Sequence, residues 1–192
     1  MSHCVGITAG NTFDCADRLK GGVNQRLILG NLANFDQFTM AGNVINALAM
    51  KSGEQCWAFD GFRDSLQPRS VFVPGTNVMG YDHQIDFLAY GVSGDDRFNL
   101  EALAYGDIFA VVENGDDSAL GNAFFEVFGL DRGLEVITME RINADGETNG
   151  AYAIQLKTPD RGGKEDGLPK VWFNTDYDTT KTAVEVLLTP QP

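Results

Sequence analysis

The sequence consists of short apolar runs that end in Gly, Asn or Asp, and this pattern constrains the fold more than any other feature. The chain contains 22 Gly and 13 Phe among its 192 residues. Sustained helical periodicity is scarce, and short apolar runs bounded by turn-forming residues are typical of β-strands. The sequence therefore predicts a mainly β protein: an antiparallel β-sandwich or barrel with one or two short α-helices and a long hairpin.

Residues 81–92 show the strand pattern most clearly. Ile85, Phe87 and Ala89 alternate with more polar positions, which gives the segment one apolar face. Residues 39–50 have a helical spacing of apolar side chains, but a glycine and two asparagines weaken a helix, so this segment stays unassigned. Further strands are predicted at residues 23–32, 54–62, 70–73, 108–112, 123–129, 134–142, 151–157 and 170–173.

Two helices and one domain complete the expected organisation. Ser93 can cap a short helix that stops at Gly106, and residues 178–188 have the pattern of a C-terminal amphipathic helix. Residues 1–22 have no hydrophobic period and end in two glycines, so they are interpreted as an N-terminal arm. Residues 23–192 then form a single β-sandwich or barrel domain with the C-terminal helix, in a chain long enough to bury roughly 70% of its unfolded surface.

The charge and the cysteines restrict the class of partner. With 27 acidic and 14 basic residues the formal net charge is −13, whereas binding to nucleic acid needs clusters of Lys and Arg. Cys4, Cys15 and Cys56 are an odd number without a C-x-x-C spacing, which favours reduced thiols over a disulfide framework or a zinc site. No apolar run approaches the roughly 20 residues that a bilayer span needs, so we expect no membrane partner.

Motifs for catalysis and for cofactors are incomplete. The sequence around Ser93 resembles a nucleophile elbow, but Asp95 stands where the elbow requires Gly. Strand alternation sends His83 to the face opposite Asp82 and Asp86, so these carboxylates cannot orient its ring. Two loops lack residues that calcium-binding and phosphate-binding loops need, namely residues 143–150 and 162–165. We therefore expect no enzyme activity, no cofactor and no metal.

Several short motifs follow one another in a recognisable order. They are Cys4, Ile7, Phe13-Asp14-Cys15, Gly21-Gly22-Val23, Arg26-Leu27-Ile28-Leu29, Leu100-x-x-Leu103 and residues 107–115, 128–134 and 149–156. In this order the chain resembles tail-tube-like structural virion proteins of tailed phages that infect Bacteroidota. The resemblance implies a β-sandwich or barrel with a flanking helix and a long hairpin.

The resemblance also implies a function. The protein would be a phage tail tube subunit that assembles with itself into stacked hexameric rings around a DNA-conducting channel. Its other partners would be tail or head-tail connector proteins, and DNA would pass through during ejection without specific binding. The subunit would assemble in the host cytoplasm and reside in the virion tail.

Other roles stay open. The polar insertion at residues 158–169 and the C-terminal helix depart from a simple tube subunit, which leaves a head-completion, tail-terminator or capsid-auxiliary role. A carbohydrate-binding β-sandwich module on the virion surface is an alternative of a different class, because exposed aromatic residues such as Trp57 and Trp172 could hold sugars.

Two sets of residues are candidate functional groups. A polar segment between two aromatic strands is longer than a tight turn requires, and it is predicted to be a hairpin tip that contacts a neighbouring subunit. It comprises Arg63, Asp64, Ser65, Leu66, Gln67, Pro68 and Arg69. The acid excess must lie on the folded surface, so acids in strands or turns are candidates for a channel wall that repels DNA. These acids are Asp82, Asp86, Glu113, Asp116 and Asp117.

Overall fold

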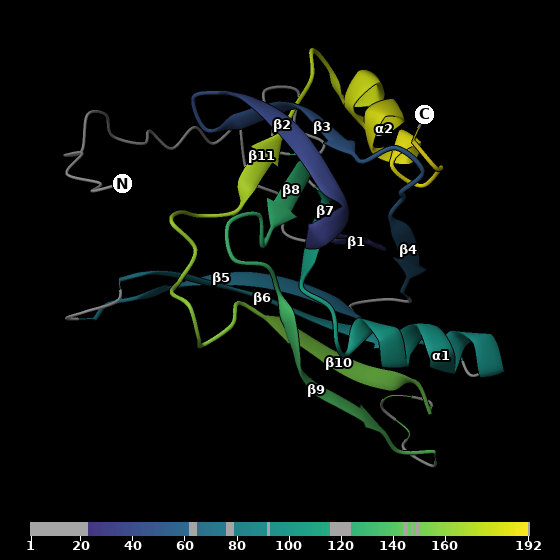
Figure 1. Ribbon diagram of the computed structural model, residues 1–192. Helices are drawn as coiled ribbons and strands as arrows, with labels where there is room; N and C mark the ends of the chain where they lie inside the picture. Colours follow the sequence, from purple (N-terminus) through teal and green to yellow (C-terminus); the bar gives the residue numbers. More distant parts are fainter. Residues whose placement is uncertain are drawn as a thin grey trace, which may run out of the picture.

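The computed structural model describes residues 23–61, 65–75, 79–91, 93–115, 124–143, 146, 148 and 150–191. Within these residues the strands form two sheets, accompanied by two α-helices (Figure 1). The prediction of a mainly β protein with antiparallel sheets and one or two short α-helices is confirmed. The predicted N-terminal arm, residues 1–22, lies outside the described part of the chain.

The larger sheet has seven strands. They are β1 (Val23–Asn31), β2 (Phe35–Ala41), β3 (Val44–Met50), β4 (Trp57–Asp60), β7 (Ile108–Asn114), β8 (Phe125–Phe128) and β11 (Lys170–Trp172). Their order across the sheet is β2-β3-β11-β8-β7-β1-β4. Neighbouring strands are antiparallel except β3 and β11, which run parallel. A 3-10 helix (Leu32–Asn34) connects β1 to β2.

The smaller sheet has four antiparallel strands. They are β5 (Leu66–Val73), β6 (Gly80–Ala89), β9 (Glu135–Arg141) and β10 (Tyr152–Lys157), in the order β5-β6-β10-β9. β5 and β6 pair from Leu66 opposite Phe87 to Val73 opposite Gly80, and this hairpin projects to the left of the body in Figure 1. It is the long hairpin of the fold.

The segment that stayed unassigned, residues 39–50, forms most of the β2–β3 hairpin. Its turn lies between Ala41 and Val44, and Gly42 adopts a positive φ of 64° there. Two-residue hairpin turns need positive φ angles, which glycine adopts without strain. The glycine that weakens a helix in the sequence pattern is thus the residue that allows the hairpin.

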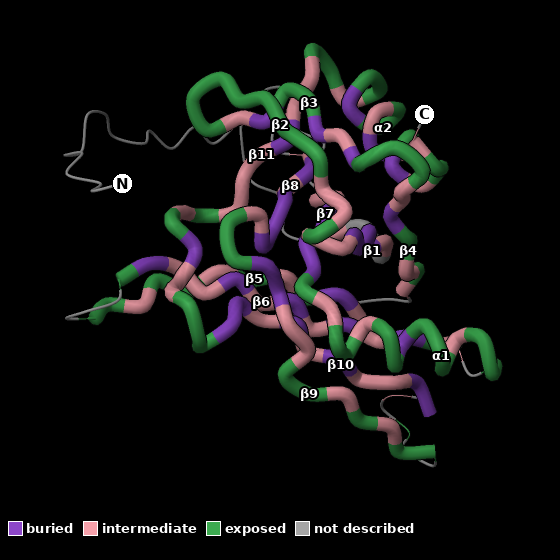
Figure 2. The backbone as a smooth tube through the Cα atoms, in the orientation of Figure 1, coloured by how far each residue is buried: buried purple, intermediate pink, exposed green. Residues whose placement is uncertain are grey.

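The two sheets and the second helix enclose two hydrophobic cores. One core lies between the sheets, and the other lies between the larger sheet and α2 (Tyr177–Val186). β7 contributes side chains to both cores. Ile108, Ala110 and Val112 face the smaller sheet, whereas Phe109 and Val111 face α2. Figure 2 accordingly shows buried backbone in the middle of the molecule. The central position of β7 explains why its apolar run is continuous rather than alternating.

The helices begin at capping residues. Ser93 caps α1 (Gly94–Leu103): its hydroxyl accepts a hydrogen bond from the backbone N–H of Asp96, and the Asp96 carboxylate accepts one from the backbone N–H of Ser93. Asp176 caps α2 through the backbone N–H of Thr179. The predicted capping role of Ser93 and the predicted C-terminal helix are confirmed. α1 buries only Leu100, so most of this helix is at the surface.

Candidate functional site

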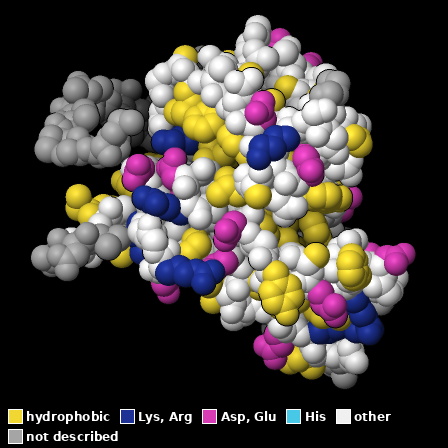
Figure 3. Space-filling view, viewed as in Figure 1, with side chains coloured by type: hydrophobic (Ala, Val, Ile, Leu, Met, Phe, Trp, Pro, Cys, Tyr) yellow, Lys and Arg dark blue, Asp and Glu magenta, His cyan; other side chains and the backbone are white. Residues whose placement is uncertain are grey.

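The edges of both sheets carry exposed apolar side chains. Among the described residues, every exposed large hydrophobic residue that lies in a strand lies in one of the four edge strands, β2, β4, β5 and β9. These residues are Phe38, Met40, Trp57, Val71, Phe72 and Ile137, which we call the edge residues. On the face seen in Figure 3, hydrophobic side chains likewise form patches between charged groups of both signs. Open edges of this kind can pair with another chain.

The four edges are not equally open. Register shifts interrupt the pairing of β2 with β3 and of β9 with β10, and irregular edges of this kind discourage pairing with another chain. β4 and β5 pair with their neighbours without a shift. Pro68 lacks a backbone N–H, which leaves the part of β5 from Arg69 to Val73 as the longer regular edge. Val71 and Phe72, 52% and 49% exposed, lie in this part.

The predicted hairpin tip at residues 63–69 is wrong for the residues that the structure describes. Leu66, Gln67, Pro68 and Arg69 belong to strand β5, and Ser65 directly precedes it. Leu66 is 4% exposed in the core between the sheets, opposite Phe87, and its burial extends the strand beyond the predicted start. The proline is tolerated because β5 is an edge strand. Arg63 and Asp64 lie outside the described residues.

The predicted strands on either side of this segment do not pair with each other either. β4 belongs to the larger sheet and β5 to the smaller sheet. The chain between them passes from one sheet to the other, so the long hairpin is β5–β6 instead. The local sequence pattern predicted both strands, but it could not show to which sheet each strand belongs.

Two of the predicted lumen acids, Asp82 and Asp86, lie on the outer face of the smaller sheet. Asp82 forms ion pairs with Lys164 at 2.7 Å and with Lys157 at 3.4 Å. Asp86 forms an ion pair with Arg69 at 2.6 Å and accepts a hydrogen bond from the amide of Gln155. Both carboxylates are therefore neutralised by neighbouring cations within the subunit.

The third acid, Glu113, lies on the opposite side of the sandwich. It belongs to β7, and its carboxylate accepts a hydrogen bond from the hydroxyl of Tyr177 on α2. One face of a subunit therefore cannot present Glu113 together with Asp82 and Asp86. Asp116 and Asp117 lie outside the described residues.

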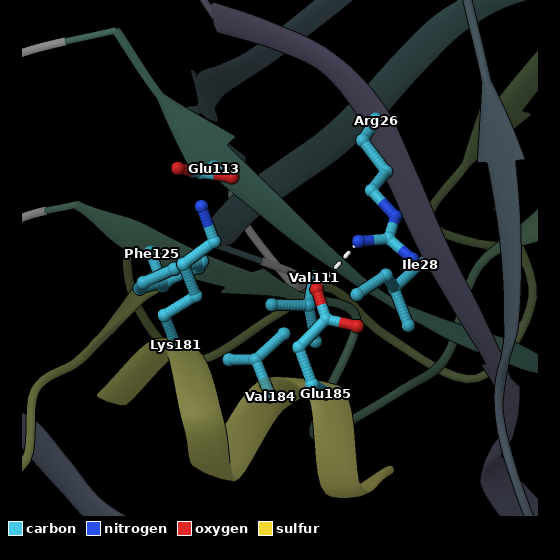
Figure 4. A pocket seen from close by; sticks show the side chains of 8 residues that line it. All are labelled: Arg26, Ile28, Val111, Glu113, Phe125, Lys181, Val184 and Glu185. Carbon is cyan, nitrogen blue, oxygen red and sulfur yellow. Dashed lines mark hydrogen bonds and ion pairs between the residues drawn. The ribbon is translucent and has the colours of Figure 1, made fainter. Parts of the chain in front are cut away.

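A small cavity under α2 brings charged groups from β1, β7 and α2 together (Figure 4). Arg26 of β1 forms an ion pair with Glu185 of α2, and Lys181 donates a hydrogen bond to the hydroxyl of Tyr177 beside Glu113. The volume of the cavity is about 10 Å³, which is room for about one water molecule. This arrangement fastens α2 to the larger sheet and has no space for a substrate.

The crossover loop, residues 158–169, contacts the buried side chain of His83 and contains a buried glutamate, Glu165. His83 is 3% exposed; its Nδ1 accepts a hydrogen bond from the backbone N–H of Gly129 at 3.1 Å, and its Nε2 lies 3.0 Å from the carbonyl oxygen of Gly167. This pattern assigns the proton to Nε2 of a neutral ring. Burial lowers the pKa of His83 to about 4. The prediction that strand alternation turns His83 away from Asp82 and Asp86 agrees with this buried position.

Glu165 fastens the same loop to the turn between β8 and β9. It is 1% exposed, and its carboxylate accepts hydrogen bonds from the backbone N–H groups of Asp131 and Arg132 at 3.1 and 3.0 Å. Burial raises the pKa of Glu165 to about 7, against the effect of the two donors. The sequence contained no signal for this residue, because a single Glu in a Gly-rich polar loop is normally solvated.

The two tryptophans lie in different environments. Trp172 is fully buried in the core beneath α2, so the prediction that it could hold a sugar is wrong. Trp57 is 45% exposed and lines a groove between β4 and α1. Of the two residues, only Trp57 can contact a ligand in the folded protein.

Comparisons with known proteins identify no relative. No family, no curated protein and no solved structure matches the chain. In the described ranges, no His, Cys, Asp and Glu side chains gather in a group of three or more that could hold a metal ion. Neither described helix is long and apolar enough to cross a membrane.

Proposed function

We propose that this protein is a structural subunit that assembles with copies of itself through its sheet edges. The observation that carries the proposal is the position of the edge residues. Apolar side chains are exposed on all four edge strands, although natural proteins usually protect such edges with charges. In an assembly, pairing of the edges would bury these side chains and satisfy the free backbone groups.

Within this class we propose a phage tail tube subunit. The motif order that resembles tail-tube-like virion proteins supports this role, and so does a long hairpin that projects from the body and could reach a neighbouring ring (Figure 1). The net charge of −13 is compatible with a channel through which DNA slides without binding. A head-completion, tail-terminator or capsid-auxiliary subunit would use the same edges, with a different assembly as the product.

The ion pairs of Asp82 and Asp86 change the charge that a channel wall would present to DNA. If the outer face of the smaller sheet lines the channel, Asp82 and Asp86 contribute as ion pairs with Lys164 and Arg69 rather than as free carboxylates. Such a wall is closer to neutral than the total charge of the chain suggests. It would still lack the cluster of unpaired cations that holds DNA phosphates.

The experiment compares two substitutions of valine by lysine. Val71→Lys places a charge on the regular edge of β5, where Val71 is 52% exposed, and Val186→Lys places the same charge on α2, where Val186 is 48% exposed. Sedimentation and electron microscopy of the purified proteins give the size and the shape of the particles. We expect Val71→Lys to shift the protein to smaller species and Val186→Lys to assemble like wild type.

The outcomes separate the two levels of the proposal. Rings or tubes with an open channel support a tail tube subunit. Closed oligomers or solid filaments keep the assembly role and exclude the tube. A wild-type protein that stays monomeric over a wide range of concentrations, or two lysine variants that behave alike, contradicts assembly through the edge of β5.

A further inference from the structure

A groove opens where the edge strand β4 meets α1. Its volume is about 470 Å³, which is within the size range of small-molecule sites. Trp57 of β4 and Tyr90, which directly follows β6, line the groove and are 45% and 38% exposed. Phe59, on the same face of β4 as Trp57, packs its ring against Phe87 with a centroid distance of 5.7 Å. The core thereby holds β4 in place while Trp57 remains accessible.

Two carboxamide groups without a partner line the same groove. Within the described part of the chain, the side chains of Asn31, at the end of β1, and Asn99, on α1, make no hydrogen bond. Each carboxamide offers both donor and acceptor atoms. Hydroxyl groups are donors and acceptors too, so a ligand rich in hydroxyl groups matches these two side chains.

The charged groups of the groove are acidic and already have partners. Asp96 accepts hydrogen bonds from the N–H and the hydroxyl of Ser93, and Asp60 lies 3.6 Å from the Nε of Arg26. No Lys or Arg is among the described residues that line the groove. A phosphate, a sulfate or an acidic sugar would therefore find no cation to bind.

We propose that this groove binds a neutral oligosaccharide. A sugar ring has an apolar face that packs against an aromatic side chain and a rim of hydroxyl groups that bonds to amides. Trp57 and Tyr90 supply the aromatic surface, and Asn31 and Asn99 supply the polar contacts. The proposal does not rest on self-assembly, because a monomer carries the same groove. It requires that β4 stays unpaired in an assembly, which pairing through the edge of β5 allows.

A quaternary ammonium ion is the other ligand that aromatic side chains and carboxylates attract. Such an ion is small, and it gains most where ring faces surround it and a carboxylate is free to neutralise it. Here Asp96 already accepts two hydrogen bonds from Ser93, Asp60 lies beside Arg26, and the groove has room for a ligand larger than a single ammonium ion. A quaternary ammonium ion also has no acceptor atom, so it cannot use the N–H donors of the two carboxamides.

The test is isothermal titration calorimetry with four neutral trisaccharides: maltotriose, cellotriose, mannotriose and chitotriose. Trp57→Ala removes the exposed aromatic side chain of the groove. Phe98→Ala is its matched control, because Phe98 is 70% exposed on α1 but does not line the groove. We expect at least one trisaccharide to bind wild type, with an affinity that falls about tenfold or more in Trp57→Ala. Phe98→Ala should bind like wild type.

Each contrary result has a distinct meaning. If none of the four trisaccharides binds wild type, the proposal is wrong. If Trp57→Ala and Phe98→Ala bind equally well, the sugar site lies elsewhere and the groove is not the site. Binding of tetramethylammonium that depends on Trp57, without sugar binding, identifies a cation site instead. If Trp57→Ala disrupts oligomers and no sugar binds, the groove is a contact between copies of the chain.

Discussion

The buried pair His83 and Glu165 gives an unusual prediction for the pH dependence of stability. Both side chains hold the crossover loop, and burial disfavours the charged form of each. The pKa of His83 falls from 6.5 to about 4, and the pKa of Glu165 rises from 4.5 to about 7. The two residues therefore respond to acid in opposite ways.

Proton binding fixes the sign of each contribution. As the pH falls from 6.5 to about 4, the unfolded chain binds a proton at His83 that the folded protein excludes, so stability is lost. As the pH falls from about 7 to 4.5, the folded protein holds a proton on Glu165 that the unfolded chain releases, so stability is gained. At about 1.4 kcal/mol per pH unit, each change amounts to about 3 kcal/mol. In wild type the two contributions oppose each other.

Glu165→Gln removes one of the two contributions and leaves His83 in place. The free energy of unfolding of this variant, relative to wild type, should fall by about 3 kcal/mol as the pH is lowered from about 7 to 4.5. Urea denaturation followed by circular dichroism measures it at each pH. Both proteins should carry Val71→Lys, so that assembly does not make stability depend on concentration.

A second comparison controls for the loss of a carboxylate. Glu101→Gln makes the same chemical change at an exposed position of α1. If the difference between Glu165→Gln and its parent stays constant from pH 7 to 4.5, or changes no more than it does for Glu101→Gln, the raised pKa of Glu165 is refuted. The opposition between His83 and Glu165 in wild type would then have no basis.

Two further predictions concern the core beneath α2. A Cβ at Gly30 would lie 2.5 Å from the ring of Phe109 and 2.7 Å from the Sγ of Cys56, so Gly30→Ala should lower the free energy of unfolding by about 1–3 kcal/mol through overpacking. Gly94→Ala, where a Cβ meets nothing within 4 Å, is the control, and equal effects of the two in urea denaturation would contradict the packing. Burial raises the pKa of Cys56 to about 12. In a variant with serine at the other two cysteine positions, a thiol reagent should label Cys56 only on unfolding, and rapid labelling of the folded protein would contradict its burial.

Local signals in the sequence predicted much of the fold. The alternation at residues 81–92 and the apolar run at residues 108–112 correspond to β6 and β7, and Ser93 caps α1 as predicted. Each of these signals is contained in a few neighbouring residues. Side-chain alternation and capping hydrogen bonds act over the same short range, so a sequence can reveal them without knowledge of the tertiary structure.

Boundaries that depend on tertiary burial could not be predicted. Leu66 belongs to β5 because it packs against the core between the sheets, although Pro68 follows it. Trp172 is buried because β11 lies between β3 and β8, far from it in sequence. The neighbours of a side chain decide whether it is exposed, and the local pattern around Trp57 and Trp172 contains no information about them.

The edge residues show the same limit at the level of function. Whether Trp57 or Phe72 is exposed depends on whether its strand ends a sheet, and the strand order joins segments that are far apart in the chain. Among the described strands, β4 pairs only with β1 and β5 pairs only with β6, so each ends its sheet. The sequence suggested assembly only through a resemblance and a hairpin tip of which Leu66, Gln67, Pro68 and Arg69 lie inside strand β5. The exposed edges support assembly on physical grounds that do not depend on that resemblance, because unpaired strands with apolar side chains gain both hydrogen bonds and burial when they pair.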